Sequence, residues 1–198
     1  MHQVTGINPF SFGIDPHSGV ITPHDNVIQR YLSHMKEMYF DQSAVESMLK
    51  SGDPLLYEVY EVEVPDEEGH LMVCTSILYP GKVGKEYYMT KGHYHEKIAT
   101  GEVYYCLRGE GCMLMESEDG QWGAEPMSRG SVVYVPPFFA HRSVNTGKEP
   151  MISFCVYPGG AGHDYASIET MGFKKLVVER DLKPCFEDNP RWRQGSAG

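Results

Sequence analysis

The stretch Thr90-Lys91-Gly92-His93-Tyr94-His95, with Glu102 seven residues after its second histidine, decides the fold of this chain. Side chains of a β-strand alternate between its two faces, so His93 and His95 are expected on the same face. The six polar or small residues before Glu102 predict a turn, and the aromatic and branched residues after it predict a second strand. We therefore expect a hairpin that carries Glu102 back alongside the two histidines.

A third histidine, His141, follows the apolar run that begins at Tyr134. Three imidazoles and one carboxylate suit a divalent first-row metal such as Fe2+, Mn2+, Ni2+, Zn2+ or Co2+, with positions left open for water or substrate. A single histidine in a strand is more often only a partly buried polar residue. The prediction of a metal site therefore depends on the combined spacing of His93, His95, Glu102 and His141.

Composition limits the class of protein. With 198 residues, the chain is long enough for one well-buried core and short for two. Its 21 glycines and 13 prolines suit many short strands joined by tight turns. The formal net charge of −10 argues against a nucleic-acid or anionic-membrane partner, although it does not exclude one basic pocket.

The cysteines and the N-terminus indicate the compartment. The five cysteines are odd in number and lack CxxC spacing, so neither a disulfide framework nor a thiolate zinc site is indicated. Cys74, Cys106 and Cys155 lie in apolar runs and are expected to be small core residues. No charged segment precedes an apolar core at the N-terminus, and no run approaches 18 apolar residues. We expect a soluble cytoplasmic protein without a membrane partner.

The first part of the chain is expected to be an arm followed by helices. Residues 1–23 are rich in turn-forming residues and predict an extended arm packed on the surface. Apolar residues between Val27 and Tyr39 recur at spacings of three and four, which predicts an amphipathic helix capped by Asp25 or Asn26. A second short helix is predicted from the cap Asp41 to Gly52.

From Leu55 onward the pattern predicts strands separated by turn signals at fairly even intervals. This arrangement predicts a mainly β protein with a single jelly-roll-like barrel. The expected strands cover residues 55–64, 71–79, 86–95, 102–107, 112–117, a short piece near Trp122, 131–135, 141–145 and 151–157. Residues 168–171 predict a short helix and 176–179 an added strand. The expected organisation is one structural domain, with residues 1–54 packed on a barrel of residues 55–180 and a loosely ordered tail of residues 181–198.

The metal-ligand spacing also resembles a known family. His93, His95 and Glu102 are followed by Gly109, and Gly130 is followed by Pro136, His141 and Asn145, which is similar to the two-part motif of the cupin superfamily. The chain departs from that motif at Tyr87 and Phe138, where the family usually has glycine. The gap between His95 and Glu102 is also longer than the commonest one.

Stretches outside this motif resemble one cupin branch, the cupin-type glucose-6-phosphate isomerases of archaea and some bacteria. They are Thr90–His95, Val133–Pro137, Ala161–Tyr165 and Asp188–Trp192, and the resemblance covers roughly residues 26–192. It implies a homodimer of cupin barrels that interconverts glucose 6-phosphate and fructose 6-phosphate, a step of glycolysis and gluconeogenesis. It also implies one divalent metal per subunit, with Fe2+ favoured.

The resemblance further implies which residues hold the substrate. The phosphate is expected on Thr90, Gly92, Ser76 and Tyr157, although a one-residue shift would put Thr75 in the place of Ser76. Independently of any family, the Thr90 hydroxyl and the Gly92 N–H are suited to bind a phosphate. The same two residues are also consistent with an ordinary threonine in a strand and a glycine in a β-bulge. The complete expected set of substrate-binding residues is Tyr57, Ser76, Thr90, Gly92, Tyr104, Tyr157, His163 and Tyr165.

Isomerisation moves a proton between C1 and C2 of the open-chain sugar, which calls for a base near carbon and an acid near oxygen. Glu102 is the only carboxylate that the sequence places in the cluster, so it is the predicted base of an enediol route. A cation lowers the basicity of a bound carboxylate. Two alternatives follow: Glu102 detaches or binds weakly when substrate arrives, or the metal drives a direct hydride shift without a base. His141 and Tyr157 are then the residues to examine for proton relay.

Other functions share these ligands. They are a mannose-6-phosphate or bifunctional phosphosugar isomerase, a cupin dioxygenase that uses Fe(II) and molecular oxygen, and a non-enzymatic sugar-binding cupin. The Thr90-Lys91-Gly92 run and the Gly162–Tyr165 loop favour the isomerase over the dioxygenase. A coupled assay on fructose 6-phosphate beside mannose 6-phosphate separates these possibilities.

Overall fold

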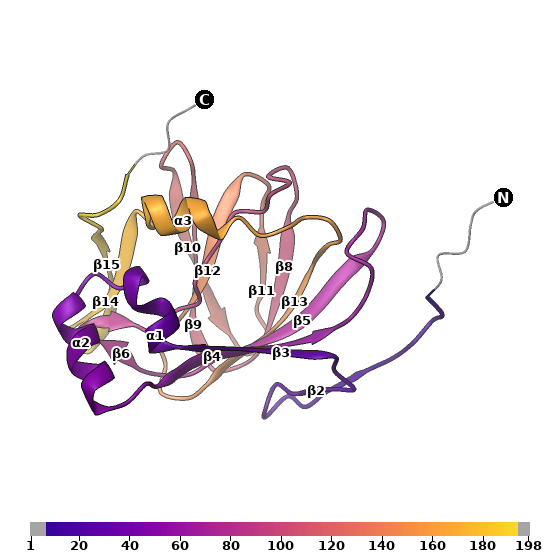
Figure 1. Cartoon of the computed structure of the whole chain (residues 1–198), viewed down its shortest axis with the longest axis horizontal. Helices are drawn as coiled ribbons and strands as arrows, with labels where there is room; N and C mark the ends of the chain where they lie inside the picture. The colour runs from indigo at the N-terminus through magenta and orange to yellow at the C-terminus, as the bar shows by residue number, and fades with distance from the viewer. Residues whose placement is uncertain (1–6, 194–198) are drawn as a thin grey trace.

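Branched, aromatic and alternating residues form strands along most of the chain in the computed structural model, which describes residues 7–193. Figure 1 shows these strands curving around a common interior. They are β1 (Gly13–Ile14), β2 (Ile21–Thr22), β3 (Asn26–Tyr31), β4 (Leu55–Val62), β5 (Leu71–Leu78), β6 (Lys82–Val83), β7 (Glu86–Tyr87), β8 (Glu102–Arg108), β9 (Glu110–Ser117), β10 (Trp122–Ser128), β11 (Val132–Val135), β12 (Phe139–Asn145), β13 (Met151–Pro158), β14 (Lys175–Arg180) and β15 (Lys183–Asp188).

The helices are few and short. They are α1 (Leu32–Met35), a 3-10 turn η1 (Lys36–Met38), α2 (Gln42–Ser51) and α3 (Tyr165–Met171). Within residues 7–193, no helix is long and apolar enough to cross a membrane. The mainly β fold class predicted from the sequence is therefore confirmed.

The largest sheet has the strand order β11-β8-β13-β5-β4-β3. A three-stranded sheet, β10-β9-β12, and a four-stranded sheet, β15-β14-β7-β6, complete the main body, and β1 pairs with β2 in the arm. Isolated bridges tie the segment between Met89 and His93 to β12. Among the described residues, the hydrogen-bonded strands thus form separate sheets around the interior. The arrangement is jelly-roll-like, and none of these sheets is a closed barrel.

The expected hairpin between residues 86–95 and Glu102 is wrong. Only Glu86–Tyr87 forms a strand there, and β8 pairs with β11 and β13. His93 pairs instead with His141, through bonds of 3.3 Å from His93 N to His141 O and 3.1 Å from His141 N to His93 O. A long-range backbone partner therefore replaces the local one, because β8 satisfies both of its edges with other strands.

The amphipathic helix predicted between Val27 and Tyr39 is also wrong over its first half. Asn26–Tyr31 is strand β3, which pairs with β4, and only α1 and η1 follow it. Neither Asp25 nor Asn26 is a helix cap, since Asp25 accepts a hydrogen bond from the N–H of Glu63, which directly follows β4. Pairing with a sheet edge has overridden a coincidental helical spacing of branched residues.

The second predicted helix is confirmed as α2. Asp41 caps it by accepting a hydrogen bond from Ala44 N at 3.0 Å, and Gly52 ends it with a backbone bond to Met48 O. Before these helices, the described part of the arm lies on the large sheet, where Thr75 Oγ1 donates to Gly19 O at 2.6 Å. Residues 1–6 of the predicted arm lie outside the described residues.

The loosely ordered tail predicted for residues 181–198 is wrong over most of its described length. Lys183–Asp188 forms β15, which pairs residue by residue with β14, the added strand predicted around residues 176–179. The connecting residues Asp181 and Leu182 have φ angles of 49° and 60°, the left-handed geometry of a tight two-residue hairpin. Residues 194–198 lie outside the described residues.

The interior between the sheets is apolar. All five cysteines are free, and Cys74, Cys106 and Cys155 are buried, as predicted. The largest fully buried side chains include Tyr39, Leu56, Met113, Met127 and Phe173. The predicted site residues gather around a pocket in this interior.

Candidate functional site

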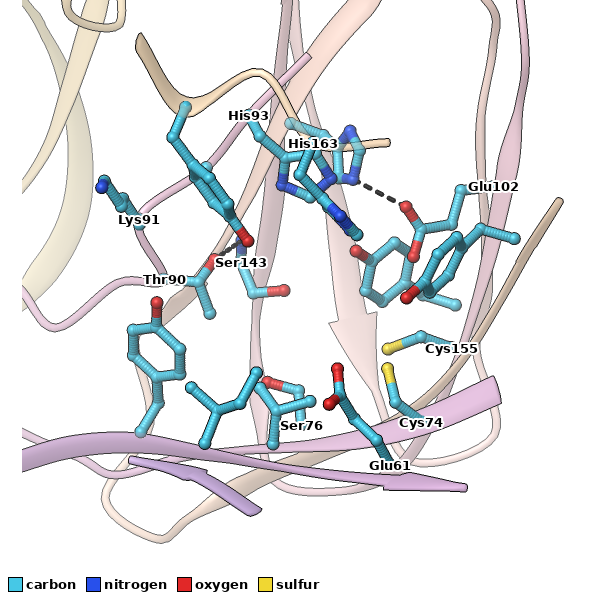
Figure 2. A pocket seen from close by; sticks show the side chains of 18 residues that line it. Glu61, Cys74, Ser76, Thr90, Lys91, His93, Glu102, Ser143, Cys155 and His163 are labelled. Carbon is cyan, nitrogen blue, oxygen red and sulfur yellow. Dashed lines mark hydrogen bonds and ion pairs between the residues drawn. The ribbon is translucent and has the colours of Figure 1, made fainter. Parts of the chain in front are cut away.

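A pocket of about 170 Å³ is lined largely by residues of the large sheet. Strand alternation explains its lining, because residues two apart on one strand face the same side. Tyr57 and Glu61 come from β4, Glu102 and Tyr104 from β8, and Tyr157 from β13. Figure 2 shows these walls facing one another across the pocket.

The four predicted metal ligands lie together, and three of them, His93, Glu102 and His141, line this pocket. One ligand atom from each of His93, His95, Glu102 and His141 lies within 4.8 Å of the others. Glu102 Oε2 is 2.9 Å from His141 Nε2 and 3.2 Å from His95 Nε2. Three ligands are buried and His93 is partly buried, so the cluster is shielded from bulk water.

Gly92 allows the histidine segment to pack this closely. Its φ of +77° is in the left-handed region, where a side chain is strained. A Cβ at this position would also lie 2.7 Å from a ring carbon of Phe173 and 3.0 Å from Arg142 Cβ. Glycine is therefore required for His93 to reach its backbone partner His141.

His95 is oriented by a second layer of contacts. Its Nδ1 lies 2.8 Å from Thr100 Oγ1 and 3.2 Å from Thr100 O. A carbonyl oxygen can only accept, so Nδ1 carries the proton and Nε2 is left unprotonated toward Glu102. Metal-binding histidines typically have their second nitrogen held in this way.

The electrostatics of the cluster suit a cation. Burial alone would raise the pKa of Glu102, but the neighbouring imidazoles, His141 foremost, together lower it well below its ordinary value. Burial, followed by the nearby His141 and His163 imidazoles, lowers the pKa of His93 well below its usual range. At neutral pH the cluster thus offers an ionised carboxylate and a neutral His93, the forms that bind metals.

An orphaned nitrogen tests whether a metal fits. His93 Nε2 is buried and has no hydrogen-bond partner among the described residues. Leaving such a group unsatisfied costs about 1–3 kcal/mol, so a missing partner is indicated. The donor set, three imidazoles and one carboxylate around one point, fits a divalent first-row metal.

All eight predicted substrate residues line the pocket: Tyr57, Ser76, Thr90, Gly92, Tyr104, Tyr157, His163 and Tyr165. Ser76 Oγ is buried without a partner among the described residues. Thr75 instead bonds to Gly19 on the opposite face. Of the two residues that the sequence left open, Ser76 is therefore the one that faces the pocket.

His163 and Tyr165 approach from the loop and helix after β13. The ring planes of His163 and Tyr165 differ by 10°, and their centroids lie 5.7 Å apart. The ring centroids of His163 and His93 lie 4.4 Å apart. Burial lowers the pKa of His163, which favours a neutral ring beside the cluster. The Gly162–Tyr165 loop thus closes one side of the pocket, as Figure 2 shows for His163.

Several lining residues were missed by the sequence analysis. They are Ile28, Val59, Glu61, Cys74, Lys91, Ser143 and Cys155. The signal for five of them was present, because each lies two or four residues from a predicted site residue on the same strand: Val59 and Glu61 from Tyr57, Cys74 from Ser76, Ser143 from His141, and Cys155 from Tyr157. Lys91 lies at the rim, where its Nζ contacts Glu169 at 2.5 Å and lies 4.8 Å from the ring centre of Tyr165.

Comparison with known proteins agrees with the site. The family model described as glucose-6-phosphate isomerase (GPI) matches residues 29–190. Glucose-6-phosphate isomerase of Thermococcus litoralis is 49% identical over 164 residues, covering 83% of this chain and 86% of that protein. The Pyrococcus abyssi enzyme of the same name is 50% identical over 166 residues, covering 84% and 88%. A putative glucose-6-phosphate isomerase 1 of Rhizobium meliloti is 34% identical over 172 residues, covering 85% of this chain and 80% of that protein.

Solved structures of low similarity were also found. An oxalate decarboxylase of Bacillus subtilis matches with a TM-score of 0.43 and 22% identity, covering 52% of this chain and 26% of that one. An oxalate oxidase matches with a TM-score of 0.43 and 13% identity, covering 52% and 49%.

Proposed function

The chain belongs to the glucose-6-phosphate isomerase family, and from this premise we propose that it interconverts glucose 6-phosphate and fructose 6-phosphate with a bound divalent metal. The observation that carries the proposal is the buried group of His93, His95, Glu102 and His141 beside a pocket lined by hydroxyl groups. Such a reaction serves glycolysis and gluconeogenesis, which fits the predicted cytoplasmic location.

His93, His95, Glu102 and His141 hold the metal in this proposal. When bound, the metal supplies a Lewis acid that stabilises negative charge developing on the sugar oxygens. Fe2+ is the proposed native ion, while Mn2+, Ni2+, Zn2+ and Co2+ accept the same ligands.

The pocket residues position the sugar phosphate. Thr90, Gly92, Ser76 and Tyr157 bind the phosphate, using hydroxyl groups and the Gly92 N–H. Thr90 Oγ1 accepts a hydrogen bond from Ser143 N at 3.0 Å, which keeps its hydroxyl proton available for an anion. The sugar hydroxyls contact the remaining pocket residues Tyr57, Tyr104, His163 and Tyr165.

Glu102 is the proposed base of an enediol route. It takes the proton from C2 of the open-chain aldose and returns it to C1, while His141 and Tyr157 relay the hydroxyl proton. Its low pKa keeps it ionised and ready to accept a proton, at a cost in basicity. Glu102 must therefore loosen from its imidazole partners during turnover.

Deuterium distinguishes this route from a hydride shift. A proton held on a carboxylate exchanges with solvent, whereas a hydride moves directly between the two carbons. The reaction is run in deuterated water, and deuterium is measured in early product. Deuterium in early product would support Glu102 as the base. Product without deuterium, together with a Glu102→Gln variant that keeps its metal and most of its kcat, would rule Glu102 out and leave the isomerase activity in place.

A coupled assay tests the function itself. Purified protein loaded with Fe2+ is given fructose 6-phosphate, and mannose 6-phosphate in parallel, while oxygen uptake is recorded. Formation of glucose 6-phosphate without oxygen uptake is expected. Oxygen consumption would indicate a dioxygenase, preference for mannose 6-phosphate a different isomerase, and binding without turnover a sugar-binding protein.

A homodimer is proposed as the assembly. The outer face of β8 and β11 exposes a row of apolar and aromatic side chains, made of Val103, Tyr105, Val132 and Tyr134. Exposed apolar surface of this kind is typical of protein interfaces, and a second copy is the usual partner. Sedimentation at micromolar concentration should show a dimer, and a Val132→Glu, Tyr134→Glu double variant should sediment as a monomer.

A further inference from the structure

Glu61 is a second carboxylate in the pocket, and the proposed isomerisation does not use it. Among the lining residues, Glu61 and Glu102 are the two carboxylates. Glu61 shares a face of β4 with Tyr57, four residues earlier. Figure 2 shows its carboxylate directed into the pocket from the wall opposite His163 and Glu102.

One oxygen of this carboxylate is anchored. Asn26 lies opposite Glu61 in the pairing of β3 with β4, and Asn26 Nδ2 donates to Glu61 Oε2 at 2.7 Å. Within residues 7–193, no hydrogen bond involves the other oxygen, Oε1. Glu61 therefore has a fixed position with one oxygen left to accept a proton from a bound molecule.

Glu61 also borders solvent. A neighbouring groove on the outer side is lined by Asp25, Asn26, Val62, Glu63 and Met72, and it shares Glu61 and Tyr157 with the pocket. Glu61 is itself only partly buried. A carboxylate between the pocket and water stays free to take up and release protons, unlike the enclosed Glu102.

A proton transfer remains unassigned in the proposed reaction. Hexose phosphates exist in water mainly as rings, whereas isomerisation acts on the open chain. Opening the ring moves a proton from O1 to the ring oxygen O5, a task for general acid–base catalysis. Glu102 is already assigned to the proton that moves between C1 and C2, so Glu61, the other carboxylate of the pocket lining, is the residue that the pocket offers for this step.

We propose that Glu61 is the residue that catalyses opening and closing of the sugar ring, a proton transfer separate from the one that Glu102 carries out; the substrate class rests on the proposed function. Glu61 Oε1 accepts the O1 proton, and the electron pair of that O–H bond forms the C1=O1 bond. The C1–O5 bond breaks with its electron pair on O5, and Glu61 returns the proton to O5. Charge and protons balance without a co-reactant, and reversal closes the ring to either anomer.

Exchange spectroscopy measures this activity directly. Interconversion of the α and β anomers of glucose 6-phosphate is followed by magnetisation-transfer NMR with the metal-loaded protein. Glu61→Gln, which preserves size and can still accept from Asn26, should slow the catalysed exchange by about a hundredfold, within the usual range for a general acid–base group. Glu63→Gln, in the groove outside the pocket, should exchange anomers at the wild-type rate.

Two further variants protect the test. Asn26→Ala releases the anchor of Glu61 and should slow exchange by about tenfold, so the inference stays testable if Glu61→Gln fails to fold. Glu102→Gln should lose isomerisation while anomer exchange continues. Metal content and thermal unfolding of each variant are measured alongside, so that a loss of folding is not read as a loss of catalysis.

The outcomes separate the two proposals. Wild-type exchange no faster than in buffer, or full exchange in a folded Glu61→Gln variant, would overturn the role of Glu61. Loss of exchange in folded, metal-loaded Glu102→Gln would overturn the separation of the two proton transfers. Rapid exchange that depends on Glu61, in a protein that isomerises nothing, would leave this inference standing and reject the proposed function.

Discussion

His141 and Arg142 are neighbours on β12, yet they belong to two different buried clusters on opposite faces of that strand. The pocket cluster is His93, His95, Glu102 and His141. The back cluster is Arg142 with Glu86 and Glu116, the two glutamates that interact electrostatically with its guanidinium. Both clusters contain buried ionisable groups, but the partners that these groups bind are different.

The back cluster is bonded to the chain around it. Arg142 Nη2 donates to Lys91 O at 2.5 Å, and its guanidinium lies 4.1 Å from the centre of the Phe173 ring. Glu86 accepts from Phe40 N at 3.0 Å, and Glu116 accepts from Lys174 N at 2.6 Å. Arg142 thus joins the segment before the metal ligands to the segments packed behind β12.

The shifts of the carboxyl pKa values differ in sign between the clusters. Burial raises the pKa of Glu86 and of Glu116 to about 7, despite Arg142 and the backbone donors. In the pocket cluster the imidazoles overcome burial and lower the pKa of Glu102. The difference teaches that the pocket cluster is arranged to receive a cation, whereas the back cluster holds segments of the chain in place.

Metal removal is expected to have the largest effect. Prolonged dialysis against a chelator should abolish isomerase turnover, because the pocket cluster then lacks its cation, and added Fe2+, Mn2+ or Ni2+ should restore it. Turnover and metal content are measured on the same samples, with circular dichroism to show that the fold persists. Full activity in a preparation shown to be metal-free would remove the distinction between the two clusters.

Arg142→Met is the next largest perturbation. Removing one partner of a buried charged cluster typically costs about 3–5 kcal/mol, so urea unfolding should show a loss of that size. Arg180→Met, which breaks the exposed pair with Glu187, should cost less than about 1 kcal/mol. Equal losses in the two variants would contradict a structural role for the back cluster.

Thr100→Val sharpens the description of the pocket cluster. The substitution removes the hydroxyl beside His95 Nδ1 and keeps the side-chain volume. Loss of such an orienting contact typically weakens metal binding by 10–100-fold, about 1.4–2.7 kcal/mol. Metal titration measures the change, and Thr170→Val on the exposed face of α3 should bind metal as wild type does.

The smallest expected effect is on the pH dependence of stability. The raised pKa of Glu86 means that the folded state binds this proton more tightly than the unfolded chain, so the stabilisation is complete below about pH 4.5. It is lost as pH rises toward 7, by up to about 1 kcal/mol per pH unit for one group. Urea unfolding at pH 5, 6 and 7 should show a shallower decline for Glu86→Gln than for wild type.

Exposed Glu46 on α2 provides the control for that experiment, since Glu46→Gln should leave the decline as in wild type. The Glu102 contribution has the opposite sign, because the pKa of this group is lowered in the folded state. Its stabilisation of the fold is complete above about pH 4.5 and is lost as pH falls through the lowered pKa. An unchanged slope in Glu86→Gln would mean that burial does not dominate the back cluster.

The sequence predicted the site better than the connections between elements. Period-two alternation correctly grouped Glu102 with Tyr104, because a strand face depends only on local geometry. Applied to Tyr57, the same rule also predicts that Glu61, four residues later on the strand, faces the pocket. Lys91 could not be found in this way, since its place at the rim depends on where α3 and Glu169 lie in three dimensions.

The errors have a common physical origin in long-range pairing. Residues 26–31 carry a helix-like spacing, but their backbone groups are satisfied by β4. Residues 183–188 form a strand only because β14 offers an edge, and the turn at Asp181 and Leu182 lacks the glycine that usually marks it. In each case the deciding partner lies on a neighbouring strand, outside the pattern of the segment itself.

The adjacency of His141 and Arg142 has a consequence for protein engineering. Losing or gaining one residue within Phe139–Asn145 would turn the strand over, sending the guanidinium into the pocket and the imidazole into the packed interior. A library that varies β12 must therefore keep its length and change only residue types. Insertions belong in the connection Thr146–Pro150, where added residues leave both faces of the strand in register.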